Sequence, residues 1–161
     1  MAWEFLGKDV LTSAGDTLDS GTITAKKFLF FNVFGIADGN LDACVIRFNG
    51  DTATNYAVRK INDGGSSSNN VNETGITYMS FNGAQNHYAR FFVYNQEDQN
   101  KLLIDKTGRT GGSGAANPPA RKVMVGKWSN TSDSITSVQA VNRDGSGSYD
   151  EGSYITVFGS D

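Results

Sequence analysis

The stretch "RFNGDTATNYAVR" (residues 47–59) contains the pattern that decides the fold. An apolar run enters it, Asn49-Gly50-Asp51-Thr52 is typical of a turn, and a second run leaves through Tyr56 and Val58. Polar turn residues between two apolar runs favour a β-hairpin. Asn and Gly tolerate a positive φ, so we expect the chain to reverse at residues 49–50. The remaining polar side chains are expected to satisfy the amides of the loop.

The same alternation recurs on both sides of this stretch. "FLFFNVFGI" (28–36) is apolar on both faces apart from Asn32, which predicts a central strand covered on both sides. "HYARFFVYN" (87–95) and "RKVMVGKW" (121–128) each divide into two faces with a period of two. Because no stretch keeps a helical apolar spacing for three turns, the chain is predicted to consist of strands.

Counted in this way, the chain contains about eight to ten short strands, a number typical of sandwiches and barrels. We predict an all-β fold, an antiparallel β-sandwich with little or no helix; one helical turn is expected within residues 75–84. All 161 residues are assigned to a single domain. Residues 1–12 are expected to be an N-terminal arm or an edge strand, and the segments 62–75 and 108–120 are expected to be long flexible loops.

Charge and composition exclude several classes of function. The net charge is −3 and no cluster of Lys and Arg occurs, so we expect no nucleic-acid partner. No apolar run approaches the roughly 18 residues that span a membrane, and the N-terminus does not have the pattern of a signal peptide. The sequence therefore predicts synthesis in a cytoplasm. Cys44 is the single cysteine and is expected to be a small buried residue without a disulfide.

Catalysis is not expected. His87 is the only histidine, it begins an aromatic strand, and no G-x-S-x-G nucleophile motif is present. We expect His87 to face solvent or to lie at a strand edge. Carboxylates are plentiful, but nothing pairs two of them across a cleft as glycoside hydrolysis requires. The chain is predicted not to be an enzyme and to need no cofactor.

Two segments are weak candidates for a calcium site. "DGNLDA" places Asp38, Asn40 and Asp42 at alternate positions, like the opening of a calcium-binding loop. It continues with alanine where an EF-hand requires glycine. The glycine-rich segment 142–153 contains Asp144 and Asp150. In both segments we favour a turn or hairpin stabilised by side-chain hydrogen bonds over a metal site.

Glycan binding is a separate possibility, because sugar sites combine an exposed aromatic ring with nearby Asn, Asp or Gln. Trp128 and Tyr149 are the principal candidates, and Tyr88, Tyr94 and Tyr154 are further ones. The alternative is that these rings pack against neighbouring strands across a sheet.

Three segments together resemble a family of small virion-associated proteins of tailed bacteriophages. They are residues 3–35 ("WEFLGKDVLTSAGDTLDSGTITAKKFLFFNVFG"), residues 47–59, and residues 126–159 ("GKWSNTSDSITSVQAVNRDGSGSYDEGSYITVFG"). The first begins with a Trp-centred strand. The second has an Asn-Gly-Asp turn followed by Asn-Tyr. The third has a Trp, Ile-Thr, a glycine-rich hairpin and a final strand ending in Gly.

The resemblance implies a jelly-roll-like β-sandwich with a structural role on the virion. The first expectation is a capsid decoration or cement protein that binds the outside of the head and bridges major capsid proteins, together with copies of itself as a trimer or dimer. The alternative is a fibre or adhesin domain that binds host glycans. Candidate residues for the protein interface are Trp3, Phe5, Leu6, Asp51, Thr52 and Asn55.

Overall fold

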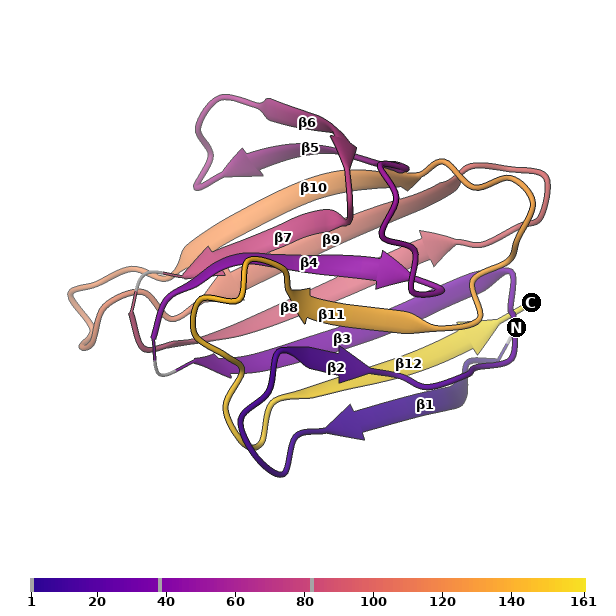
Figure 1. The fold of residues 1–161 in the computed structure, drawn as a ribbon. Helices are drawn as coiled ribbons and strands as arrows, with labels where there is room; N and C mark the ends of the chain where they lie inside the picture. Colours follow the sequence, from indigo (N-terminus) through magenta and orange to yellow (C-terminus); the bar gives the residue numbers. More distant parts are fainter. Residues whose placement is uncertain (1, 38, 82) are drawn as a thin grey trace.

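The computed structural model describes residues 2–37, 39–81 and 83–161, which form twelve β-strands in two antiparallel sheets (Figure 1). No helix occurs in these ranges, and hence none that is long and apolar enough to cross a membrane. The strands are β1 (Glu4–Val10), β2 (Thr17–Asp19), β3 (Phe28–Ala37), β4 (Leu41–Phe48), β5 (Tyr56–Asn62), β6 (Ser68–Glu73), β7 (Ile76–Phe81), β8 (Gln85–Tyr94), β9 (Lys101–Arg109), β10 (Ala120–Trp128), β11 (Val138–Asn142) and β12 (Tyr154–Ser160).

The order of the strands confirms the predicted jelly-roll sandwich. The larger sheet has the order β1-β12-β3-β8-β9-β10-β5-β6, and the smaller sheet has the order β2-β11-β4-β7. Without the hairpins β5–β6 and β9–β10, eight strands remain in two sheets of four, ordered β1-β12-β3-β8 and β2-β11-β4-β7. This is the interleaved order of a jelly roll. The two hairpins extend the larger sheet beyond β8, which explains why the strands outnumber the predicted eight to ten.

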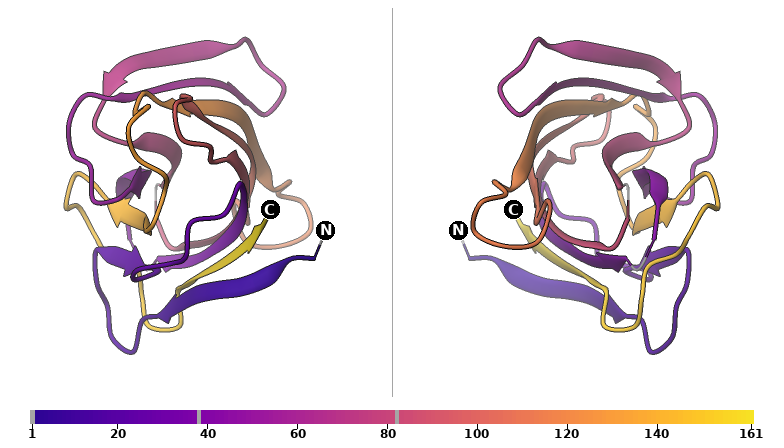
Figure 2. Two further views of the ribbon diagram at one scale, coloured as in Figure 1. Left: turned by 90° about the vertical axis from the view of Figure 1, so that its right-hand side faces the viewer. Right: turned by 90° about the vertical axis from the view of Figure 1, so that its left-hand side faces the viewer.

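The core lies between the two sheets, which face each other in the end-on views of Figure 2. Strict alternation in β3 buries Leu29, Phe31 and Val33. Phe31 stacks on Phe91 of β8 with ring centroids 4.5 Å apart. Side chains of this size each stabilise the fold by about 1.5–3 kcal/mol when fully buried. The prediction that β3 is covered on both sides is wrong, because its outward side chains are only half-buried.

Residues 47–59 do form the predicted turn, but they do not form a hairpin. Asn49 and Gly50 have φ values of 53° and 66°, as expected. However, β4 belongs to the smaller sheet and β5 to the larger one, so the turn carries the chain from one sheet to the other. Strand β5 does not pair with β4; one of its two neighbours is β10, which lies more than fifty residues later in the chain.

Two other local predictions need correction. The helical turn expected within residues 75–84 is instead strand β7, whose Ile76 and Tyr78 are buried with a period of two. The expected loop 62–75 contains strand β6, which pairs with β5 to form the outer hairpin of the larger sheet. The segment between β9 and β10, residues 110–119, has no strand.

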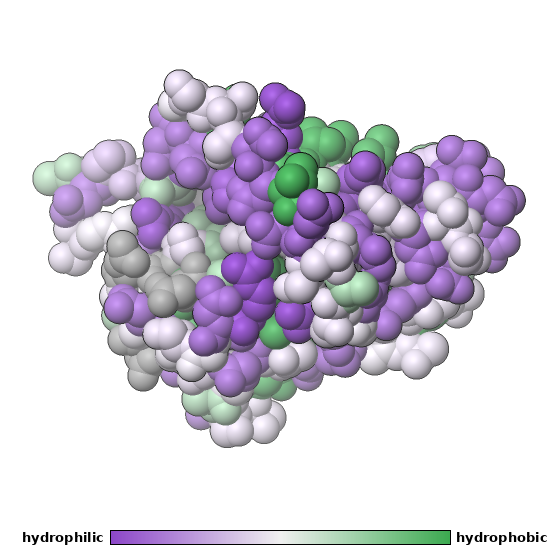
Figure 3. Space-filling view, turned by 45° about the horizontal axis from the view of Figure 1, so that its top comes forward, coloured by the Kyte–Doolittle hydropathy of each residue, from purple (hydrophilic) through white to green (hydrophobic). Residues whose placement is uncertain are grey.

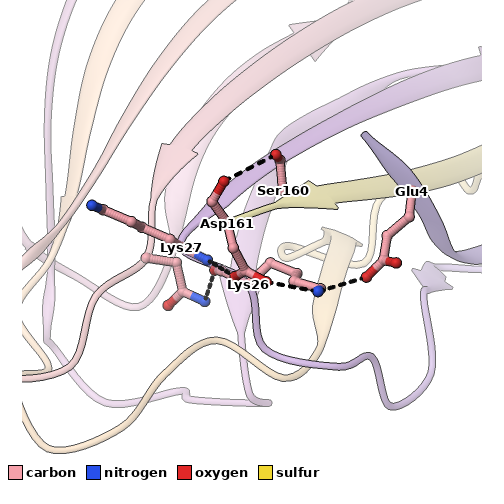
Figure 4. A network of polar contacts seen from close by, with 6 residues as sticks. Glu4, Lys26, Lys27, Ser160 and Asp161 are labelled. Carbon is pink, nitrogen blue, oxygen red and sulfur yellow. Dashed lines mark hydrogen bonds and ion pairs between the residues drawn. The ribbon is translucent and has the colours of Figure 1, made fainter. Parts of the chain in front are cut away.

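The N-terminal segment is an edge strand that pairs within its own chain. Strand β1 runs antiparallel to β12, with a bulge between Phe5 and Gly7. The Lys26 ammonium lies 2.9 Å from Glu4 Oε1 and 2.8 Å from Asp161 Oδ2, so it joins β1 to the C-terminus (Figure 4). Hydrogen bonds to Asp161 and Glu4 raise the pKa of Lys26, which remains charged throughout the physiological range.

Candidate functional site

The outer face of the larger sheet carries a row of apolar side chains across six strands. Cross-strand pairing places them side by side in the order Phe5, Phe158, Phe30, Phe92, Ile104 and Val125. Four of them are strongly exposed: 60% for Phe5, 53% for Phe92, 57% for Ile104 and 49% for Val125. Such a run across a sheet is unusual on the open face of a sandwich, where outward positions are normally polar.

Aromatic contacts hold this row in a fixed arrangement. The ring of Phe30 lies 4.7 Å from that of Phe92 and 6.2 Å from that of Phe158, and Trp3 packs edge-on against Phe30 at 6.1 Å. Beside them, Leu102 and Ile104 line an apolar hollow of about 450 Å³. We call this surface the aromatic face; its exposed members are Trp3, Phe5, Tyr88, Phe92, Leu102, Ile104, Val123 and Val125.

The aromatic face is large enough to be an interface. Its eight large side chains are each about half exposed and present roughly 700 Å² in total, taking about 200 Å² for each of the four aromatic side chains and about 150 Å² for each of the four smaller aliphatic ones. That exceeds the largest apolar patch of a typical monomer, about 300–600 Å². It also approaches the roughly 800 Å² that each partner contributes to a stable protein–protein interface.

The charged residues on this face all have the same sign. Among the residues that the structure describes, the outward strand positions of the larger sheet hold six cationic side chains and no carboxylate, and Arg90 and Lys106 are paired across β8 and β9. The cations are Lys8, Arg59, Arg90, Lys106, Arg121 and Lys127. The remaining eight Lys and Arg share the rest of the chain with all 17 Asp and Glu, so that part has a formal charge of −9. The molecule is therefore electrostatically polarised.

The opposite side of the molecule has a different character. Figure 3 looks at it from the side of the smaller sheet, with the β5–β6 edge tilted forward. The surface in this view is mainly hydrophilic, and its hydrophobic residues form small separate groups. The aromatic face is therefore a property of one sheet and not of the whole surface.

The two principal glycan candidates are buried, so their prediction as exposed rings is wrong. Trp128 is 1% exposed, and its indole Nε1 donates a hydrogen bond to Asp51 Oδ2 at 2.7 Å. Tyr149 is 0% exposed, and its hydroxyl lies 2.9 Å from that of Tyr78. Trp128 occupies an inward position at the end of β10, and Tyr149 lies between β11 and β12, bridged to Gly15, with its ring in the core. Among the other candidates, Tyr88 is exposed, whereas Tyr94 and Tyr154 are half-buried.

His87 is also buried, contrary to the expectation of a solvent-facing or edge position. Its Nε2 lies 3.1 Å from the Tyr78 hydroxyl. Burial lowers the pKa of His87 to about 3, so the ring is neutral at pH 7. Cys44 lies in the same interior, as predicted, and burial raises the pKa of its thiol to about 12. A neutral histidine and a protonated thiol enclosed in the core have no access to a substrate.

Two further ionisable side chains lie inside the sandwich. Asp105 is fully buried and accepts a hydrogen bond from the Thr107 hydroxyl, 2.7 Å from Oδ2. Burial raises the pKa of Asp105 to about 7. Lys122, which is 8% exposed, faces the same interior from β10, and burial lowers its pKa to about 8. Neither residue was predicted from the sequence, although each occupies an apolar-face position of an alternating strand.

The predicted interface residues fall into two groups. Trp3 and Phe5 are exposed on the aromatic face, and Leu6 packs against the core. Asp51 is engaged within its own loop, because its carboxylate accepts hydrogen bonds from Ala53 N at 2.8 Å and Asn55 Nδ2 at 3.0 Å. Thr52 and Asn55 are exposed beside it.

The weak calcium candidates that the structure describes do not converge on a common site. Asp38 lies outside the described residues, as does the side chain of Asp42. The Asn40 side chain accepts a hydrogen bond from Gly83 N at 2.7 Å, and Asp144 pairs with Arg143 at 3.0 Å. Asp150 is half-buried, and its backbone amide donates to the Ile36 carbonyl. Within the described ranges no group of three His, Cys, Asp or Glu side chains has the arrangement of a metal site.

Comparison with known proteins adds no relative to this picture. No family model matches the chain, and a search of curated proteins finds no match. The aromatic face and the resemblance of the three sequence segments are the observations that bear on function.

Proposed function

We propose that the protein is a non-enzymatic structural component of a bacteriophage virion, a decoration or cement protein that binds the outside of the head. The aromatic face is the observation that supports this proposal. A rigid apolar row, continuous across six strands, is suited to permanent burial against another protein. Bridging adjacent major capsid proteins through such a face would stabilise the shell by burying apolar surface.

The charge of the aromatic face favours the shell over a second copy of the chain as its partner. In a two-fold symmetric contact each patch meets itself. Six cations would then face six cations, with no carboxylate at the outward strand positions to compensate them. A shell surface that combines apolar side chains with Asp or Glu would satisfy both features. Copies of the chain, as a dimer or trimer, would instead meet along the sheet edges, where β1 and β6 each have an unpaired side.

The proposal is tested with particles of the phage that encodes the chain. Purified particles should contain hundreds of copies, and particles lacking the protein should bind the recombinant chain and become more resistant to heat. The double substitution Phe92→Glu with Ile104→Glu should abolish binding, since it buries two carboxylates in the contact. Thr17→Glu, on the outer face of the smaller sheet, is the matched control and should bind normally.

Three results would contradict the proposal: absence of the chain from particles, a few copies per particle, or normal binding of the Phe92/Ile104 variant. Circular dichroism of the variant must first show a folded protein.

A fibre or adhesin domain that binds host glycans is the second candidate, and one observation favours it. A hollow of about 460 Å³ opens beside the exposed ring of Tyr88, lined also by Phe34, Asn86 and Arg90. An aromatic ring with nearby amide and guanidinium donors is the composition of many sugar sites. Binding on a glycan array that is lost in Tyr88→Ala, together with a low copy number, would favour this function over capsid decoration.

A further inference from the structure

We propose that one end of the space between the two sheets binds a small oxyanion, of the phosphate or sulfate class, between Lys122 and Arg109. A cavity of about 160 Å³ lies there, and Asn62 and Ser80 contribute to its walls. The site is separate from the aromatic face and does not depend on the proposed function.

Lys122 faces the cavity without a described protein partner for its ammonium group. Its side chain is more than nine-tenths buried, yet among the described residues no hydrogen bond or ion pair involves its ammonium group. Lys101, the other deeply buried lysine, is satisfied by the carbonyl oxygens of Gln99 and Asn130, each at 3.0 Å. The ammonium is not among the enclosed polar atoms without a partner, so it reaches the open space of the cavity, where a ligand has access to it.

Positive charge is in excess around the cavity. Among the described residues, the inward-facing charged side chains at this cavity are those of Arg109 and Lys122, with a single carboxylate, that of Asp63; Arg121 also borders it, but its side chain belongs to the outer face of β10. The Asp63 carboxylate already accepts a hydrogen bond from the backbone amide of Arg121 at 2.7 Å. These three groups have a formal charge of +1, and Lys60 adds a further positive charge close enough to lower the pKa of Lys122.

The buried carboxylate of Asp105 does not form an ion pair with the Lys122 ammonium. Asp105 lies diagonally across the β9–β10 pair from Lys122, whose direct neighbour is Thr107. Diagonal neighbours in a sheet are about 7–8 Å apart, and no ion pair joins these two side chains. The Asp105 carboxylate is held by the Thr107 hydroxyl instead. An oxyanion with several acceptor oxygens could contact the Lys122 ammonium and the Arg109 guanidinium together.

The experiment measures the thermal midpoint of the full chain at pH 7 in sodium phosphate and in sodium chloride at matched ionic strength. Lys122→Met retains the apolar stem and removes the charge. Lys127→Met is the matched control, because Lys127 lies on the same strand but on the outer face. Calorimetric titration with inorganic phosphate gives the affinity directly.

We expect phosphate to raise the midpoint of the native chain and of Lys127→Met beyond the effect of chloride. The affinity of Lys122→Met for phosphate should be at least tenfold weaker. If Lys122→Met does not fold, Arg109→Gln replaces it with the same expectation. Equal midpoints in phosphate and chloride, or an undiminished phosphate effect in both variants, would overturn the proposal.

Discussion

Asp51 shows how one polar residue organises the loop between β4 and β5. Burial raises the pKa of its carboxyl group. Hydrogen bonds from Asn55, the Trp128 indole and the Ala53 amide together lower this pKa by more than burial raises it, so the net shift is downward. The carboxylate is the hydrogen-bond acceptor of the Trp128 N–H group. The polar side chains of this loop thus stabilise the loop itself through hydrogen bonds within the chain.

Replacing Asp51 with alanine should destabilise the protein by about 1–3 kcal/mol, because the N–H of the buried Trp128 loses its acceptor. Urea denaturation at pH 7 measures this change. Thr52→Ala, at the neighbouring exposed position, is the control and should change stability by less than about 0.5 kcal/mol. Equal effects of the two substitutions would contradict the role assigned to Asp51.

Asp105 predicts a specific dependence of stability on pH. Its pKa is about 7 in the folded state and 3.8 in the unfolded chain. Between these values the folded state holds a proton that the unfolded state has released, so this stabilisation is complete below pH 3.8 and decreases as pH rises through 7. The slope is at most about 1.4 kcal/mol per pH unit.

Comparison with Asp105→Asn isolates this effect. The variant is uncharged at every pH, so the stability of the native chain relative to the variant should fall steadily from pH 4 to pH 7. His87 is neutral in the folded protein. Between pH about 3 and 6.5 it makes stability rise with pH, which is opposite in sign to the effect of Asp105. That slope is common to both proteins and cancels in the difference. A constant difference over this pH range would show that Asp105 does not titrate as proposed.

At the scale of elements, the pairing of β3 with β8 depends on a missing side chain. Gly35 lies directly opposite His87, and a Cβ atom at position 35 would overlap the buried imidazole ring. The ring cannot move easily, because it is enclosed in the core and contacts the Tyr78 hydroxyl. Glycine is therefore required here for space and not for a special backbone angle.

Gly35→Ala should destabilise the protein by about 1–3 kcal/mol through overpacking. Gly108→Ala, on the outer face of β9, is the matched control, since the nearest atom to its added Cβ would be the Ala120 carbonyl oxygen at 3.9 Å. Denaturation of Gly35→Ala in a His87→Ala background completes the test. The cost of Gly35→Ala should shrink there, and an unchanged cost would place the strain elsewhere.

At the scale of the whole molecule, the chain is divided into an apolar, cationic face and an acidic remainder. If the face docks on an acidic shell, its charges should accelerate attachment. Arg90→Gln with Lys106→Gln should slow attachment to particles about tenfold at low salt. In about 1 M salt, where screening acts over roughly 3 Å, the two rates should converge. Stopped-flow light scattering measures both rates, and a difference that persists at high salt would contradict electrostatic steering.

Local sequence was sufficient to predict most of the strands and their two faces, although β6 and β7 were not predicted. The alternation in residues 28–36, 87–95 and 121–128 is a property of neighbouring residues, and a strand places neighbours on opposite faces whatever it pairs with. The turn at Asn49-Gly50 was predictable for the same local reason. The resemblance to phage proteins added the jelly-roll topology, which periodicity alone did not contain.

Only the tertiary structure decided which sheet each strand joins and which of its two faces is buried. A period of two is symmetric between the faces, so alternation did not show that Trp128 points inward, and the burial of Tyr149, which lies outside the strands, depends on its bridge to the distant Gly15. Residues 47–59 have the local form of a hairpin, yet β5 pairs with β10, because partner choice depends on contacts with distant strands. The aromatic face and the Lys122 cavity arise in the same way, from side chains far apart in sequence that pairing places side by side.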